Sequence, residues 1–159
     1  MIDEKIIKER LATELRTRMN AKNERVGDVS YHCEIDQGIL YRCQDNGQFP
    51  NPWQLVMIAE HFDCSVNELL GFEPFDVSGK YEASRIFPGE NHFAEYLSHR
   101  IIQYLNNHEM TIEELVRCVR STTGTVNRWF QRWPALPRTI HLHRLADALN
   151  CTPSDLLGY

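Results

Sequence analysis

The sequence predicts an all-α protein made of two similar five-helix units in tandem. Apolar residues recur three or four positions apart along most of the chain, and no stretch has the alternating pattern of a strand. Helix-start signals precede several of these stretches. Residues 59–72, AEHFDCSVNELLGF, return in related form as residues 146–159, ADALNCTPSDLLGY.

The repeat extends over most of the chain. Pro50 aligns with Pro137 and Cys64 with Cys151 at an offset of 87, whereas upstream the apolar pattern aligns at an offset of 86. One residue is therefore inserted in the second copy, within residues 131–136. The repeat predicts a first domain at residues 1–73, a connector at residues 74–92 and a second domain at residues 93–159.

The first two helices of each unit are predicted from apolar spacing and a capping signal. Apolar residues recur every four positions at Ile7, Leu11, Leu15 and Met19, and again at Phe93, Leu97, Ile101 and Leu105. This spacing places one apolar stripe along a first helix. Thr111 and Glu114 have the spacing of a capping box, so a short second helix begins there.

Three further helices complete each unit. The third and fourth follow from apolar spacing, over about residues 36–43 and 122–130 and about residues 52–62 and 139–149. Ser65 and Thr152 are predicted N-caps of a fifth helix, and Pro153 follows Thr152 at the first helical position. Only Leu-Leu-Gly follows the four-residue starts at 65–68 and 152–155, so the fifth helix has one or two turns.

The connector is predicted to pack on the two units and to give them a defined mutual orientation. It contains prolines and glycines but also five large apolar residues, which are unusual in a free linker. These residues are Phe75, Val77, Tyr81, Ile86 and Phe87.

Composition indicates a cytoplasmic protein without a membrane span. The N-terminus is too charged for a signal peptide, and no apolar run approaches the length of a membrane-spanning helix. The five cysteines have no CxxC spacing, which indicates reduced thiols that pack as small apolar side chains. They are Cys33, Cys43, Cys64, Cys118 and Cys151.

The second and third helices have the pattern of a helix-turn-helix. In the second copy the apolar positions are Leu115, Val116, Val119, Val126 and Trp129. Ser121 and Thr122 form a polar turn between the two helices. The outward face of the third helix is then free to enter the major groove of a duplex.

With the closing Leu-Leu-Gly, each unit resembles the five-helix DNA-binding domain of the lambda-repressor and Cro family, also called XRE-like. The resemblance covers residues 6–72 and 93–159. It implies that the third helix reads DNA bases from its first residues and from residues one turn on. The implied base-reading residues are Thr123, Gly124, Asn127 and Arg128 in the second copy, and Gln37, Gly38, Tyr41 and Arg42 in the first.

The chemistry of these residues suits base reading. Arginine can donate two hydrogen bonds to guanine, asparagine and glutamine can pair with adenine, and a threonine methyl can contact thymine. Glycine at the second position resembles family members in which the helix approaches the groove closely. The resemblance also implies that Thr111, Gln131 and Arg132 contact phosphate.

Two departures from the family pattern concern helix starts and packing. Ile112 and Val26 open the second helices, where the family commonly has a phosphate-binding glutamine, so backbone amides alone are expected to bind phosphate there. The family also often buries an Arg–Glu pair. At those positions this chain has Leu105 with Phe130 and Met19 with Gln44, which predicts apolar contacts instead.

A third departure is in charge. Glu34, Asp36 and Asp45 surround the third helix of the first copy. Residues 1–75 carry 13 Asp and Glu against 8 Lys and Arg, whereas residues 93–159 carry 6 against 7. We therefore expect the second copy to bind DNA more strongly.

Other kinds of site are not indicated. The histidines have no paired spacing that would hold a metal, and no cofactor is expected. No nucleophile motif or phosphate-binding glycine loop is present, so the chain is not predicted to be an enzyme. Trp129 is predicted to lie in the core, whereas a surface position and a partner contact remain equally open for Trp133.

The sequence thus predicts a sequence-specific transcriptional regulator from a prokaryote, phage or other mobile element, which binds double-stranded DNA through two non-identical units. The net charge of −5 leaves an alternative open. This alternative is a protein-binding adaptor or antitoxin-like module, in which the acidic first domain engages a protein partner. A homodimer also remains open.

Overall fold

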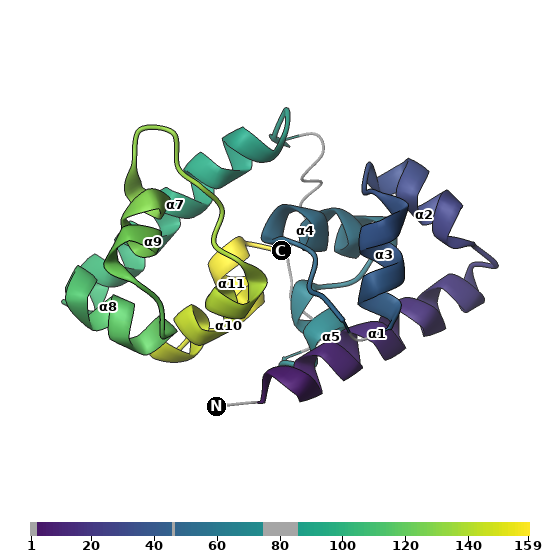
Figure 1. Ribbon diagram of the computed structural model, residues 1–159, viewed down its shortest axis with the longest axis horizontal. Helices are drawn as coiled ribbons and strands as arrows, with labels where there is room; N and C mark the ends of the chain where they lie inside the picture. The colour runs from purple at the N-terminus through teal and green to yellow at the C-terminus, as the bar shows by residue number, and fades with distance from the viewer. Residues whose placement is uncertain (1–2, 46, 75–85) are drawn as a thin grey trace.

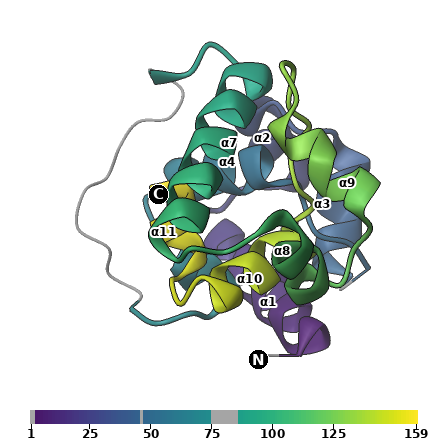
Figure 2. The ribbon, with the colours of Figure 1, turned by 90° about the vertical axis from the view of Figure 1, so that its left-hand side faces the viewer.

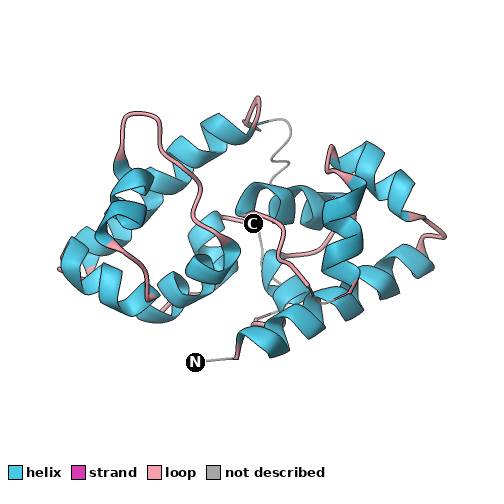
Figure 3. Cartoon of the chain, viewed as in Figure 1, coloured by secondary structure: helices cyan, strands magenta, loops and turns pink. Residues whose placement is uncertain are grey.

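The computed structural model describes residues 3–45, 47–74 and 86–159, and within these ranges every regular element is helical (Figure 3). The predicted all-α fold class is therefore confirmed. The first helix group comprises α1 (Glu4–Ala21), α2 (Val26–Cys33), α3 (Gln37–Gln44), α4 (Pro52–His61) and α5 (Val66–Leu70). The second helix group comprises α7 (Glu90–Asn107), α8 (Ile112–Val119), α9 (Thr123–Asn127), the 3₁₀ turn η1 (Arg128–Phe130), α10 (Thr139–Ala148) and α11 (Pro153–Leu157).

The long helices α1 and α7 bury the apolar stripes that the sequence predicts. All eight stripe residues are at most 5% exposed. Burial of each such side chain contributes about 1.5–3 kcal/mol, so these stripes anchor both groups. The Asp3 carboxylate begins α1 by accepting a hydrogen bond from the Lys5 N–H at 2.9 Å.

The predicted capping signals are confirmed. Thr111 and Glu114 form a reciprocal capping box at α8. Ser65 caps α5, and Thr152 caps α11 with Pro153 at the first helical position. Because each cap satisfies backbone amides that have no partner within the helix, these helix starts are set by local sequence.

The third helix of the second group differs from the prediction in its last turn. The α-helix ends at Asn127, and the 3₁₀ turn η1 continues to Phe130. The Arg128 carbonyl accepts a hydrogen bond from the Ala135 N–H at 3.0 Å, after the chain has folded back. Gln131 is extended, with φ of −73° and ψ of 168°, so the helical segment ends before it.

Left-handed residues occupy equivalent positions in the two groups. The non-glycine pairs are Asn23 and Glu109, Glu34 and Arg120, and Asp63 and Asn150. Glu34 and Arg120 end α2 and α8 with φ of 55° and 53° and turn the chain into α3 and α9. A non-glycine residue in this region costs about 1–2 kcal/mol. The two helix-turn-helix turns therefore share the same strained conformation.

The two groups are related in space by an approximate half-turn about the viewing direction of Figure 1. In that view α1 and α7 lie at lower right and upper left, α2 and α8 at upper right and lower left, and α3 and α9 at right and left. Each helix of one group thus lies opposite its counterpart.

A shared core joins the groups. Five aromatic rings contact one another with centroids 5.0 to 6.5 Å apart. They belong to Trp53, Phe87, Phe93, Tyr96 and Tyr159. Trp53 comes from α4 and Phe93 from α7, so this cluster connects the two groups directly.

The connector prediction is confirmed only for Phe87, which packs against the core. Ile86 is 53% exposed, so the expectation that it packs is wrong. Because Ile86 and Phe87 are adjacent, they do not both face the core. Phe75, Val77 and Tyr81 lie outside the described residues.

The cysteines behave largely as predicted. Cys33 and Cys43 are buried, and Cys118 is exposed. Burial raises the pKa of Cys33, Cys43 and Cys64 to about 12, which keeps these thiols protonated and unreactive. In the described ranges, no helix has the length and hydropathy needed to cross a bilayer.

Candidate nucleic-acid interface

The outward face of α9 and η1 carries four of the predicted base-reading residues. Val126 and Trp129 are buried, three positions apart, and hold this segment on the core. The intervening and preceding positions therefore face outward. The exposed residues are Thr123, Gly124, Asn127 and Arg128. The structure thus brings together the predicted reading residues of the second copy.

The start of α9 is fixed by its own side chains. The Thr122 hydroxyl accepts a hydrogen bond from the Thr125 N–H at 3.2 Å and donates one to the Thr125 hydroxyl at 2.9 Å. These bonds use Thr122 and Thr125 for capping. The Thr123 side chain has no such role and stays exposed.

Gly124 presents a bare stretch of backbone. A Cβ atom added at Gly124 meets nothing within 4 Å. The absence of a side chain is therefore not required for folding. Without a side chain at Gly124, the surface of α9 is lower at this position. A duplex could therefore approach the helix backbone closely.

The residues predicted to contact phosphate are exposed, two of them after η1 and one at the start of α8. Gln131 and Arg132 follow η1 and are exposed, and the Arg132 guanidinium lies 5.6 Å from the centre of the Trp133 ring. Thr111 is also exposed at the start of α8. Its N–H and hydroxyl both donate to Glu114, which holds the pKa of that carboxyl below its ordinary value. A charged carboxylate thus sits where phosphate binding was predicted.

The corresponding face of α3 is more crowded. Gln37, Tyr41 and Arg42 are exposed, as predicted for reading residues. However, the Arg42 Nε donates to Gln48 at 2.7 Å, and a Cβ atom at Gly38 would lie only 2.9 Å from the Asp36 carboxylate. Binding to a base therefore requires Arg42 to leave its present hydrogen bond.

Carboxylates set the charge of the α3 face. Asp36 caps α3 by accepting a hydrogen bond from the Gly38 N–H at 2.8 Å, and Glu34 and Asp45 are exposed nearby in sequence at its two ends. Exposed carboxylates repel phosphate. The α3 face is therefore a weaker candidate for DNA binding than the α9 face.

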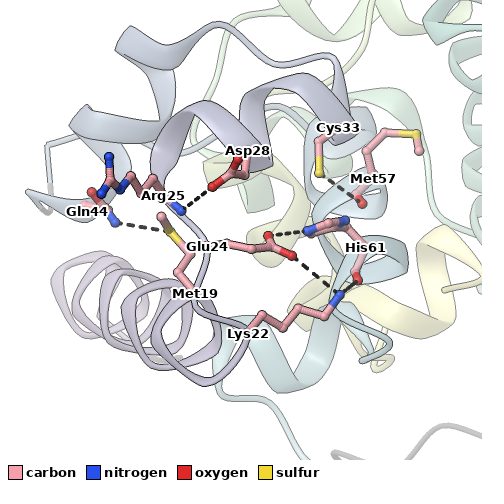
Figure 4. A network of polar contacts seen from close by, with 9 residues as sticks. All are labelled: Met19, Lys22, Glu24, Arg25, Asp28, Cys33, Gln44, Met57 and His61. Atoms are coloured by element: carbon pink, nitrogen blue, oxygen red, sulfur yellow. Dashed lines mark hydrogen bonds and ion pairs between the residues drawn. The ribbon is translucent and has the colours of Figure 1, made fainter.

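The apolar contact predicted in place of an Arg–Glu pair is present in the second helix group. In the first helix group the prediction is wrong. Leu105 is buried and Phe130 packs against the same core. In the first group, the Gln44 Nε2 instead donates to the Met19 sulfur at 3.3 Å (Figure 4). The side-chain amide of Gln44 is costly to bury without a hydrogen-bond partner, and the Met19 sulfur is a weak acceptor for it.

Arginines outside the predicted site bind the C-terminal carbonyls of α8 and α3. Arg144 of α10 donates to the Val119 carbonyl at the end of α8, at 3.1 Å. Arg16 of α1 donates to the Gln44 carbonyl at the end of α3, at 2.7 Å. Both bonds satisfy a helix C-terminus with a positive charge. The two arginines lie far from their partners in sequence, so no local signal indicates their roles.

A polar network also supports the start of α2 (Figure 4). The Glu24 carboxylate lies 2.6 Å from His61 Nε2, which joins the α1–α2 turn to the end of α4. The Arg25 N–H donates to Asp28 at 2.8 Å. These contacts position α2, and through it α3, within the first group.

Two buried histidines lie on α10, and one of them, His141, contacts the buried side of η1. His143 is 3% exposed, and His141 packs on Trp129 with ring centroids 5.5 Å apart. Burial lowers the pKa of both histidines below the ordinary value, and the charge of Arg144 lowers it further. The folded protein thus holds both rings in the neutral form at neutral pH.

This burial predicts a loss of stability in mild acid. The unfolded chain takes up protons near pH 6.5, whereas the folded protein resists them until the pH is lower. The free energy of unfolding is therefore expected to be fully retained above pH 6.5 and to fall as the pH drops below it. Urea denaturation at pH 7.5 and 5.5 measures this change. His143→Gln should flatten the dependence, and an equally steep slope in that variant would contradict the prediction.

Comparisons with known proteins address the second group. Residues 100–159 match the family model of the Cro/C1-type HTH DNA-binding domain. Neither the curated proteins nor the solved structures that were searched contain a match. The matched segment includes α8, α9, α10 and α11, and therefore all of the exposed α9 face. Residues 100–159 are thus similar to a Cro/C1-type helix-turn-helix domain, which supports a DNA-binding regulator.

Proposed function

We propose that this protein is a sequence-specific, double-stranded-DNA-binding transcriptional regulator of prokaryotic or phage origin. Its two helix-turn-helix domains span residues 1–73 and 93–159, and residues 74–92 connect them. The observation that carries the proposal is the exposed row of Thr123, Asn127 and Arg128 on a helix fixed to the core. Rigid placement of reading side chains is what discrimination between bases needs.

Each exposed residue has a defined role in this proposal. Arg128 donates two hydrogen bonds to a guanine, and Asn127 pairs with an adenine in the major groove. The Thr123 methyl contacts a thymine, while Gly124 lets the helix approach the bases. Arg132 and Gln131 contact phosphates and set the register, without reading sequence.

The second domain supplies most of the affinity. Its cations release counterions when they meet phosphates, whereas the acidic surroundings of α3 oppose that release. Arg42 also gives up its bond to Gln48 before it meets a base. Two unequal reading surfaces therefore act on one duplex.

Selection of bound duplexes from a random pool tests the proposal. An enriched motif, with affinity that falls steeply as salt rises, is the expected result. A motif in two unequal parts assigns reading to both domains, and one short motif assigns it to a single domain. Recovery of no sequence, or affinity without salt dependence, would overturn the proposal. That result would favour an adaptor or antitoxin-like module whose acidic first domain binds a protein.

Alanine at Gly124 separates folding from DNA binding. We expect Gly124→Ala to keep or raise stability, by up to about 1 kcal/mol, because alanine favours a helix and the added methyl meets open space. The same methyl enters the groove, so duplex affinity should fall about tenfold, or about 1.4 kcal/mol. Urea denaturation and a binding titration measure the two effects.

Gly89 provides a matched control, because a Cβ atom there also meets nothing within 4 Å. Gly89→Ala adds the same methyl at the start of α7 and should leave duplex affinity unchanged. Equal affinity for the Gly124→Ala variant and the unmodified protein would mean that the α9 face does not approach DNA closely.

A further inference from the structure

A buried pair of hydrogen bonds joins α5 to α11. The Asn67 N–H donates to the Ser154 hydroxyl at 2.9 Å, and the Ser154 N–H donates to Asn67 Oδ1, also at 2.9 Å. Asn67 is 0% exposed and Ser154 is 1% exposed. Each residue thus satisfies the other's backbone amide in a place that water does not reach.

Asn67 and Ser154 are equivalent residues. They lie 87 positions apart, which is the offset of the repeat in this part of the chain. Each residue donates its backbone N–H to the side-chain oxygen of the other. Such a reciprocal contact between equivalent residues is characteristic of a two-fold axis. The half-turn in Figure 1 relates α1 to α7, α2 to α8 and α3 to α9.

Three further hydrogen bonds join the two helix groups, and they are not duplicated by equivalent residues in the described ranges. The Val66 N–H donates to the Tyr159 carbonyl at 3.3 Å, whereas the equivalent of Val66 is Pro153, which has no N–H to donate. The Thr139 hydroxyl, which is buried, donates to the Pro50 carbonyl. Asn51 Nδ2 donates to Glu90 at 2.8 Å.

These bonds, together with the aromatic cluster around Phe93, make the junction specific. A rotation or slip of one helix group on the other would break buried hydrogen bonds, each of which is costly to leave unsatisfied. The relative orientation of α3 and α9 is therefore determined by the junction. The covalent connection alone does not specify it.

The junction puts both reading helices on one side of the molecule. Figure 2, turned by 90° from Figure 1, shows α3 and α9 toward the same edge, on the right. Figure 1 shows them on opposite sides of the centre of the molecule, α3 on the right and α9 on the left. A duplex has local two-fold axes of its own, and two reading helices related by such an axis enter successive major grooves on one face of the duplex, about 34 Å apart.

We infer that the Asn67–Ser154 junction makes one chain an internal pseudo-dimer, which binds a duplex site of two unequal half-sites in inverted orientation at one fixed spacing. This inference rests on the proposed function and adds the arrangement of the target. The complex contains one chain per site. Asn67 and Ser154 are positioning residues, since they act through α3 and α9 and do not touch DNA.

The test uses the unmodified chain and duplexes built from its own selected motif. One duplex keeps both half-sites, a second reverses one half-site to give a direct repeat, and a third inserts five base pairs between them. We expect a one-to-one complex with the first duplex. Affinity for the other two should be about 100-fold lower, because the second half-site no longer adds its effective concentration.

Substitution of Ser154 tests the role of the junction. Ser154→Ala removes the acceptor of the Asn67 N–H, and we expect the preference for inverted over direct half-sites to fall about tenfold. Ser154→Thr keeps a hydroxyl and should retain the preference. Both duplexes contain the same half-sites, so a general loss of folded protein lowers both affinities equally and does not change their ratio.

The possible failures can be told apart. No enriched duplex overturns the proposed function itself. An enriched duplex with half-sites in direct orientation, with variable spacing or with two chains bound leaves that function standing and overturns the pseudo-dimer. An unchanged preference in Ser154→Ala overturns the positioning role of the pair.

Discussion

Trp129→Ala is expected to lower the free energy of unfolding by about 3–5 kcal/mol, the usual cost of removing a large aromatic side chain from a core. Trp129 is 2% exposed and contacts Phe130 and His141. Its removal leaves a cavity directly beneath η1, so the α9 face loses its support. Urea denaturation, followed by circular dichroism, measures the loss.

Trp133 is the matched control, four residues along. Its side chain is 74% exposed and contacts the Arg132 guanidinium. Trp133→Ala should therefore change the free energy of unfolding by less than about 0.5 kcal/mol. Similar losses for the two variants would contradict the assignment of Trp129 to the core and of Trp133 to the surface.

Arg128→Ala is expected to weaken binding to the selected duplex by about 1–3 kcal/mol, or about 5–150-fold, because a bidentate contact to guanine is lost. The loss should be confined to duplexes with the preferred base pair at one position. Stability should change little, because Arg128 is exposed. Titration against duplexes that vary at each position measures both affinity and specificity.

One further arginine variant and one lysine variant show whether the loss of affinity is specific to Arg128. Arg132→Ala removes a proposed phosphate contact, so it should weaken binding to all duplexes and lower the salt slope by about one. Lys5→Ala removes the same charge from a side chain 81% exposed on α1 and should have little effect. If Arg128→Ala weakens all sequences equally, Arg128 is not a base-reading residue.

Arg42→Ala in the first domain is expected to have a smaller effect than Arg128→Ala. Its guanidinium donates to Gln48, and exposed carboxylates flank α3 in sequence, so its net contribution to DNA binding is expected to be smaller. This comparison ranks the two reading surfaces within one protein.

Most helices follow from the sequence because their signals are local. The stripes of α1 and α7, the Thr111–Glu114 capping box and the burial of Trp129 are all confirmed. Apolar spacing decides which residues of a helix share a face, so exposure of Thr123 and Arg128 follows once Val126 and Trp129 are placed in the core.

Other features depend on contacts that no local pattern indicates. The left-handed turns at Glu34 and Arg120 use residues without a preference for that conformation, and the 3₁₀ end at η1 depends on a bond from Ala135. Arg144 reaches the end of α8 from a different helix. The burial of Ile86 was predicted wrongly because composition does not decide which of two adjacent side chains faces the core.

Local sequence specifies the helices, their outward faces and the resemblance of each copy to a helix-turn-helix unit, because spacing and caps act over a few residues. How the two copies meet depends on long-range packing, which no local pattern indicates. Asn67 and Ser154 are ordinary polar residues of short helices, and nothing in their neighbourhood predicts that they are buried against each other. Their pairing requires two segments 87 residues apart to fold together, and we propose that it orients α3 and α9.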